Sequence, residues 1–115
     1  MIMNTQLESL TRSLKRLSIE KDCRLWKRIA TDLEKPSRIR RMVNIYKIDA
    51  HAKEGETIIV PGKVCGDGEL TKNVTVAAYQ FSDSAKKKIE QKGKAITIVE
   101  LMQQNPQGAK VRILG

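Results

Sequence analysis

The sequence predicts one mixed α/β domain, and three observations lead to this prediction. Residues 1–49 carry apolar side chains at helical spacing, whereas residues 50–115 contain short β-branched segments among helical patterns. A glycine-rich stretch, residues 60–70, separates two of those segments. A length of 115 residues suits a single domain with one modest hydrophobic core. We therefore expect a helical basic part over 1–49 and a part with strands and helices over 50–115.

Two helices are predicted near the start of the chain. The first begins with a capping-box pattern at residues 5–8 and runs from Thr5 to about Leu17, with leucines every three or four residues. The second ends before Pro36, because proline interrupts the hydrogen bonds of a helix. Its apolar stripe consists of Leu25, Trp26, Ile29, Ala30 and Leu33. The helical spacing favours a core position for Trp26 over a surface on which a base stacks.

A third helix is predicted to begin with Ser37 near its N-cap. Its buried side is expected to consist of Ile39, Met42, Val43 and Tyr46. The polar residues 49–56 would then form a hinge that leads into the second part of the chain.

The glycine-rich stretch is predicted to be a shaped turn between strands over 57–60 and 74–78. Three glycines and a proline within eight positions do not suit the interior of a regular element. The stretch does not match the phosphate-binding loop of nucleotide-binding proteins, because Val64 follows Lys63 where that loop needs a hydroxyl. We expect a positive φ at one or more of Gly62, Gly66 and Gly68.

The remaining elements are predicted from caps and stop signals. Ser82 is the expected N-cap of a helix through Gln91 that Gly93 closes. A short strand at residues 95–96 precedes a capping box at 97–100 and a helix to about Gln104. A last short strand covers residues 111–114.

The charge of the chain indicates an anionic partner. The formal net charge is +9, and residues 1–49 hold twelve Lys and Arg against six Asp and Glu, while residues 50–115 hold ten against seven. Seven of the eight arginines lie in the first 41 residues. Arginine binds phosphate in a bidentate manner that lysine does not match, so this bias favours RNA contact over a basic face that serves only solubility.

Other classes of function have weaker support. Cys23 and Cys65 lack paired ligands and are interpreted as free thiols, and His51 is interpreted as a surface residue, so no metal, cofactor or catalytic pair is expected. Asp67 and Glu69 are interpreted as polar residues that belong to the turn. No signal peptide or membrane span is expected. A helix-turn-helix DNA-binding factor is disfavoured, because the expected turn is led by proline and the next helix start is dense in arginine.

Several motifs in order resemble one known family. They are VPGKVCGDGEL at 60–70, VTVAA at 74–78, FSDSA at 81–85, KGKA at 92–95 and an ending with Asn105, Pro106, Gly108 and Val111 to Ile113. In these motifs the chain resembles the archaeal and eukaryotic large-subunit ribosomal protein family called eighteen-e, a relative of bacterial large-subunit protein fifteen. Cys65 stands where that family more often has an aliphatic residue.

This resemblance implies N-terminal helices followed by an irregular ββα-type superhelix of short strands and helices. It also implies a structural constituent of the large ribosomal subunit in the cytoplasm that binds large-subunit ribosomal RNA and neighbouring ribosomal proteins, with no membrane or small-molecule partner. A basic RNA- or DNA-binding module outside the ribosome is the alternative. The expected RNA-binding residues are Arg12, Lys15, Arg16, Arg24, Lys27, Arg28, Lys35, Arg38, Arg40, Arg41, Gly62 and Lys63.

Overall fold

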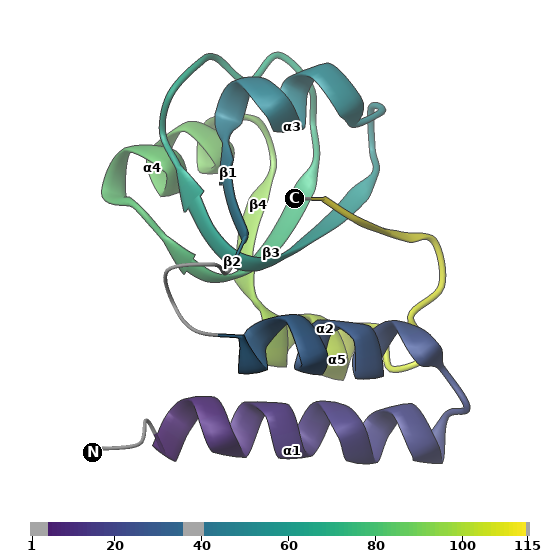
Figure 1. The fold of residues 1–115 in the computed structure, drawn as a ribbon. Coiled ribbons are helices and arrows are strands. Elements are labelled where there is room, and N and C mark those ends of the chain that lie inside the picture. Colours follow the sequence, from purple (N-terminus) through teal and green to yellow (C-terminus); the bar gives the residue numbers. More distant parts are fainter. Residues whose placement is uncertain (1–4, 36–40, 115) are drawn as a thin grey trace.

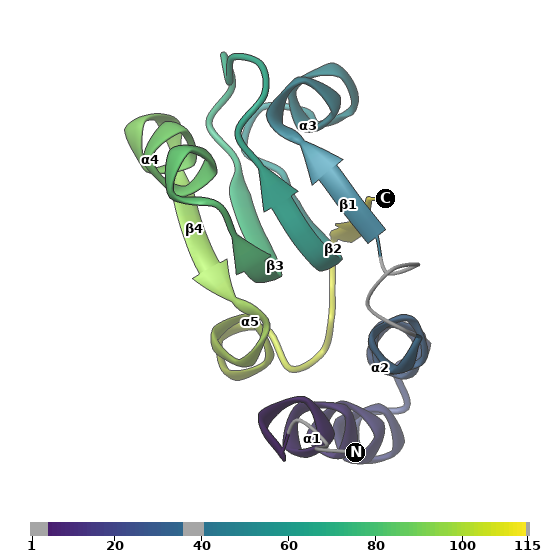
Figure 2. The ribbon, with the colours of Figure 1, turned by 60° about the vertical axis from the view of Figure 1, so that its left-hand side comes forward.

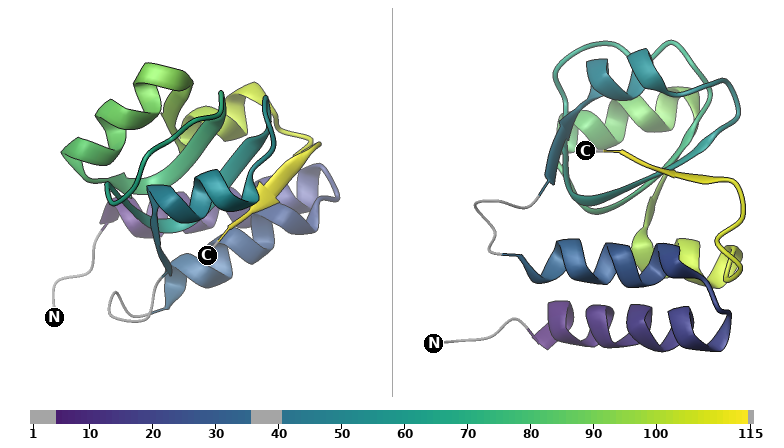
Figure 3. Two further views of the ribbon diagram at one scale, coloured as in Figure 1. Left: turned by 90° about the horizontal axis from the view of Figure 1, so that it is seen from above. Right: turned by 45° about the vertical axis from the view of Figure 1, so that its right-hand side comes forward.

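The computed structural model describes residues 5–35 and 41–114, except for the side chains of Thr5 and Arg41. A parallel sheet lies between two layers of helices, as Figures 1 and 2 show. The helices α3 and α4 cover one face, α2 and α5 cover the other, and α1 packs outside α2 (Figure 3). The described elements, in order, are α1 (Thr5–Glu20), α2 (Arg24–Glu34), β1 (Arg41–Asn44), α3 (Ile45–His51), β2 (Thr57–Cys65), β3 (Thr75–Phe81), α4 (Asp83–Lys92), β4 (Lys94–Thr97), α5 (Ile98–Gln104) and β5 (Val111–Ile113).

The sheet has the strand order β1-β2-β3-β4, with β5 also paired to β2, and each of these pairings is parallel. The strand β3 lies along one side of β2. On the other side, β5 pairs with residues 57–59 and β1 pairs with residues 62–65. The first and last strands of the described chain therefore lie end to end along the longest strand.

The prediction of a turn over residues 60–70 is wrong for its first half, because β2 continues through Pro61 and Gly62 to Cys65. The register with β3 shifts between Val60 and Lys63, which marks a β-bulge. Proline has no N–H to donate to the sheet, and a bulge is one of the few places where a strand tolerates it. The neighbour of β2 on its other side also changes here, from β5 to β1.

Two hydrophobic clusters fill the space on either side of the sheet, and neighbouring residues of β2 contribute to opposite clusters. Ile58 and Val60 pack towards α3 and α4, whereas Ile59 packs towards α1, α2 and α5. Parallel strands that are covered on both faces are expected to be apolar without alternation, as these residues are. Trp26 is fully buried in the second cluster, which confirms its predicted core position.

The predicted third helix is wrong over residues 41–44. This segment is the strand β1, and α3 begins at Ile45. Val43 is buried as predicted, but Met42 is 64% exposed and Tyr46 is 59% exposed. Pairing with β2 decides the structure, because so short an apolar pattern fits a strand as well as a helix. Ser37 and Ile39 lie outside the described residues, and α3 includes the first three residues of the predicted hinge.

The later elements confirm the predictions made from caps. The Ser82 hydroxyl accepts a hydrogen bond from the Ala85 amide at the start of α4. Thr97 and Glu100 form the predicted capping box of α5. Mixed α/β architecture with the N-terminal helices first is confirmed as well. The strand β2, with nine residues, is longer than the short strands that the sequence analysis expected.

Candidate nucleic-acid interface

The helix α2 presents three basic side chains on one exposed face. Its apolar stripe is buried against the sheet and α1, so Arg24, Lys27 and Arg28 remain exposed on the side away from that stripe. Residues three and four positions apart are neighbours on a helix, and these three obey that spacing. Together with Thr31 and Asp32 they line a surface hollow of about 440 Å³. We call this hollow the α2 groove.

Asp32 and Lys35 modify the charge at the end of the α2 groove. The Asp32 side chain is only 7% exposed, and its Oδ1 lies 3.2 Å from Nζ of Lys35. The predicted RNA-binding residue Lys35 therefore has an intramolecular partner. Because the Lys35 side chain is 46% exposed, its ammonium group can also bind an anion from the solvent.

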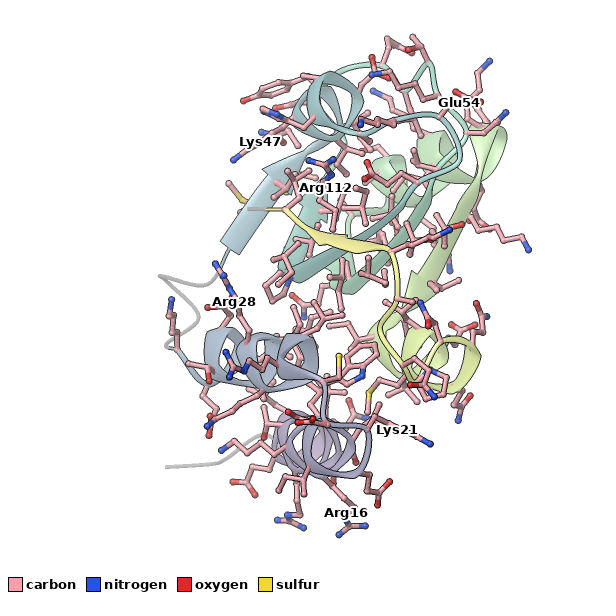
Figure 4. The ribbon with its side chains drawn as sticks, turned by 90° about the vertical axis from the view of Figure 1, so that its right-hand side faces the viewer. Arg16, Lys21, Arg28, Lys47, Glu54 and Arg112 are labelled. Atoms are coloured by element: carbon pink, nitrogen blue, oxygen red, sulfur yellow. The ribbon has the colours of Figure 1, made fainter. Side chains whose placement is uncertain are left out.

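The predicted residues of α1 are exposed as expected, but one of them has a partner. Nζ of Lys15 lies 3.0 Å from Oε2 of Glu34, and both side chains are about half exposed. Such an exposed pair contributes little to stability, so Lys15 remains available for an anion. Figure 4 places Arg16 on the outer side of α1 and Arg28 on the side of α2 nearest β1. Arg16 and Arg28 thus lie on different sides of the molecule.

The other predicted residues are divided as well. Lys63 is exposed on β2 beside Met42, its register partner on β1. Gly62 is buried within the sheet and offers no surface to a partner. Arg38 and Arg40, and the side chain of Arg41, lie outside the described residues.

One basic residue that the sequence analysis missed lies beside this set. Lys47 is half-buried on α3, and Figure 4 shows it on the same side of the molecule as Arg28, with β1 between them. No sequence pattern marked it, because the third helix was placed too early. We define the β1-edge face as Arg24, Lys27, Arg28, Lys47 and Lys63.

The rest of the glycine-rich stretch, residues 66–70, follows β2 and is called the glycine loop. A lysine holds it, and its geometry does not suit a phosphate. Nζ of Lys88 donates to the carbonyl oxygens of Gly66 and Gly68, at 2.6 and 2.7 Å. A phosphate loop turns its amide N–H groups towards the anion, whereas these two carbonyls face a cation. Gly68 has a φ of +103°, which confirms the prediction of a positive φ among the three glycines. Lys88 is therefore not free to bind RNA.

A second lysine holds the end of α3. Nζ of Lys72 donates to the carbonyl oxygens of Asp49 and Ala52, at 2.5 and 2.8 Å. The Asp49 carboxylate in turn accepts hydrogen bonds from the Thr71 amide and hydroxyl, each at 2.8 Å. These bonds, with that from the backbone amide first, lower the pKa of Asp49 below its ordinary value. The connection from β2 to β3 is thus fixed to α3 by side chains.

The surface beside β5 carries charges of both signs. Nε of Arg112 lies 2.8 Å from Oε2 of Glu56. The backbone amide of Lys53 and then Arg112 lower the pKa of Glu56. This pairing makes the region a poorer site for a polyanion than the β1-edge face.

An apolar hollow outside the basic faces is a separate feature. It has a volume of about 510 Å³ and lies between α1, β3 and the start of α5. Its lining contains Gln6, Leu10, Tyr79 and Val99, and the described residues contribute no charged side chain to it. Without a cation, it does not match a phosphate.

The described residues offer no group of three His, Cys, Asp or Glu side chains that could hold a metal ion. His51, at the end of α3, is exposed. Over the same residues, no helix is long and apolar enough to cross a membrane.

Comparison with known proteins identifies the family. A family model described as the ribosomal proteins 50S-L15 and 50S-L18e, together with a protein of the 60S subunit, matches residues 23–97, which include α2 and the glycine loop. The chain belongs to this family. It is 49% identical to the large ribosomal subunit protein eL18 of Methanospirillum hungatei, over 96% of this chain and 93% of that protein. The proteins of the same name from Methanococcus maripaludis and Haloarcula marismortui are 44% and 42% identical, over 99% and 96% of this chain and 96% of each relative.

Proposed function

We propose that this chain is a structural constituent of the large subunit of the cytoplasmic ribosome, where it binds and stabilises large-subunit ribosomal RNA. The observation that carries the proposal is the family relationship, since the relatives match nearly end to end and are named large ribosomal subunit protein eL18. The net charge of +9 agrees with a polyanionic partner. Neighbouring large-subunit proteins are further proposed partners, and we propose no catalytic activity.

The α2 groove and the β1-edge face are the proposed centre of the RNA contact. The groove combines three exposed cations, two of them arginines, on a helix that the core holds in place. Guanidinium groups on a rigid element suit the fixed spacing of phosphates along an RNA strand. Arg12, Lys15 and Arg16, on the outer helix, are proposed to contact a second segment of RNA, because α1 presents Arg16 on a different side from Arg28. Arg38, Arg40 and Arg41 remain proposed contacts.

The test is the binding of large-subunit ribosomal RNA by the full chain at several salt concentrations. If about six phosphates are contacted, affinity should fall roughly a thousandfold between 50 and 200 mM salt, because each contact releases condensed counterions. A triple variant with glutamine at Arg24, Lys27 and Arg28 should bind more weakly. It should also lower the slope of log affinity against log salt by roughly two to three. Its thermal unfolding should match that of the wild type, since all three side chains are exposed.

A matched control removes three exposed lysines of α4: Lys86, Lys87 and Lys92, each changed to glutamine. Lys88 is left intact, because it holds the glycine loop. The control should lose less affinity and less slope than the α2 variant. Equal losses in the two variants would mean that binding follows net charge alone, and the α2 groove would no longer be a specific contact. Failure of the wild type to sediment with the large subunit would overturn the proposed function itself.

A further inference from the structure

The surface at the end of β1 carries an exposed aromatic ring that the core does not explain. Tyr46 is 59% exposed, whereas Trp26 is buried and Tyr79 and Phe81 are partly buried. Met42, four residues earlier on β1, is 64% exposed. Tyr46 is therefore the one aromatic residue of the chain, all four being described, that presents most of its surface to solvent.

Tyr46 lies at the edge of the sheet where ligands usually bind in parallel α/β folds. The strand β1 ends at Asn44, and Tyr46 is in the first turn of α3. The glycine loop leaves the carboxyl end of the neighbouring strand β2 and approaches the same turn. In open parallel sheets, binding sites form outside the carboxyl ends of the strands.

The glycine loop fixes the backbone of Tyr46. Its amide donates to the carbonyl oxygen of Asp67 at 2.9 Å. A Cβ on Gly68 would lie 2.6 Å from the Tyr46 Cβ and 2.7 Å from its amide nitrogen, so only glycine allows this approach. Lys88 then holds the loop through its two carbonyl bonds. The most distinctive motif of the sequence thus supports a ring that is exposed.

The charges near the ring favour a nucleotide as its partner. Lys47 follows Tyr46 on α3 and is half-buried. Asp67 and Glu69 of the glycine loop, whose Asp67 carbonyl accepts the hydrogen bond from the Tyr46 amide, are exposed carboxylates. Phosphates would be attracted to Lys47 and repelled from the carboxylates of the loop. This arrangement disfavours a phosphate backbone that lies across the loop and favours contact with the ring through a base.

We propose that Tyr46, held by the glycine loop and Lys88, stacks on the face of an unpaired base of the large-subunit ribosomal RNA, while Lys47 contacts a flanking phosphate. This inference rests on the RNA-binding function proposed above. Base-specific recognition of RNA commonly uses unstacked bases, and every base offers a face to an aromatic ring.

The test compares Tyr46→Ala with Tyr46→Phe in binding to large-subunit ribosomal RNA. Loss of one stacked base should weaken binding roughly tenfold to a hundredfold in the alanine variant. The phenylalanine variant keeps the ring and should stay within about threefold of the wild type. Because no phosphate contact is lost, the salt slope of the alanine variant should equal that of the wild type. Ultraviolet cross-linking of the wild-type complex should join Tyr46 to a nucleotide that is unpaired.

Two results would overturn the inference. The alanine variant could bind ribosomal RNA as tightly as the wild type, or the phenylalanine variant could lose as much affinity as alanine. In the first case, failure of the alanine variant to enter assembled subunits would assign the ring to a protein neighbour. Each of these results is distinct from a failure of the proposed function, in which the wild type itself would show no salt-dependent binding to the RNA.

Discussion

The cations of α2 and those that hold the connection from β2 to β3 have similar chemistry but different surroundings. Arg24, Lys27 and Arg28 are exposed along a hollow and have no carbonyl group aimed at them among the described contacts. Lys72 and Lys88 are partly buried, and each donates to two backbone carbonyl oxygens. The first group is available to a partner, whereas the second replaces the water that those carbonyls would otherwise bind.

This difference shows that a run of basic residues in the sequence does not by itself form a basic interface on the surface. Lys86, Lys87 and Lys88 are consecutive in the chain, yet Lys88 alone turns inward to the glycine loop. Net charge predicts that an anion is bound somewhere. Burial and the positions of carbonyl groups decide which side chains can bind it.

The largest effect on stability is expected from Gly68→Ala, in the connection between β2 and β3. It should lower the free energy of unfolding by about 3 kcal/mol, because it adds both a strained positive φ and a clash with the Tyr46 backbone. The matched control is Gly55→Ala, which has a φ of +80° but no atom within 4 Å of the added Cβ. That control should lose only about 1 kcal/mol from backbone strain. Urea denaturation measures both values, and equal losses would contradict the packing of the loop on Tyr46.

A smaller effect is expected from Lys88→Met, which keeps the aliphatic stem and removes the ammonium. Two carbonyl groups would lose their donor, so unfolding should become easier by about 2 kcal/mol. Lys87→Met on the exposed side of α4 should change stability by less than about 0.5 kcal/mol. If the two variants have the same urea midpoint, Lys88 has no holding role and the contrast with α2 is lost.

The smallest effect concerns Asp49 and pH. Its folded-state pKa is lowered, so the unfolded chain binds more protons in acid and stability is lost as pH falls through the folded pKa, below the ordinary value of 3.8. Asp49→Asn should therefore reduce the acid-induced loss of stability below about pH 4, though Glu56 will still contribute to it. Melting temperatures between pH 2.5 and 7 measure this change, with Glu90→Gln as a control for net charge. An unchanged profile in the asparagine variant would contradict the role of the Thr71 bonds.

The elements with strong local signals were predictable from the sequence. Ser82 and Thr97 are caps whose hydrogen bonds form within one turn, and the α2 stripe repeats over three turns. The segment 41–44 was not predictable, because its structure depends on pairing with residues 62–65. The continuation of β2 through Pro61 was missed for a related reason, since a bulge is defined by the neighbouring strand and not by the proline itself.

The candidate interface was predictable only in part. Helical spacing was sufficient to place Arg24, Lys27 and Arg28 outside the apolar stripe, and they are exposed. Spacing could not separate the side of Arg16 from that of Arg28, because that depends on how α1 packs on α2. The exposure of Tyr46 was missed together with the start of α3.

The indole N–H of Trp26 donates to the carbonyl oxygen of Pro106 at 2.9 Å, across 80 positions of the chain. Shortly after Pro106, the chain forms β5, which pairs with the start of β2. Contacts between segments so distant in sequence form late, and a chain emerging from the ribosome presents its N-terminal residues first. During synthesis, the inner side of α2 is therefore not fully packed until residues 106–113 have been added. Part of the support for the α2 groove therefore comes from the segment around Pro106, which is distant in the sequence and is synthesised after α2.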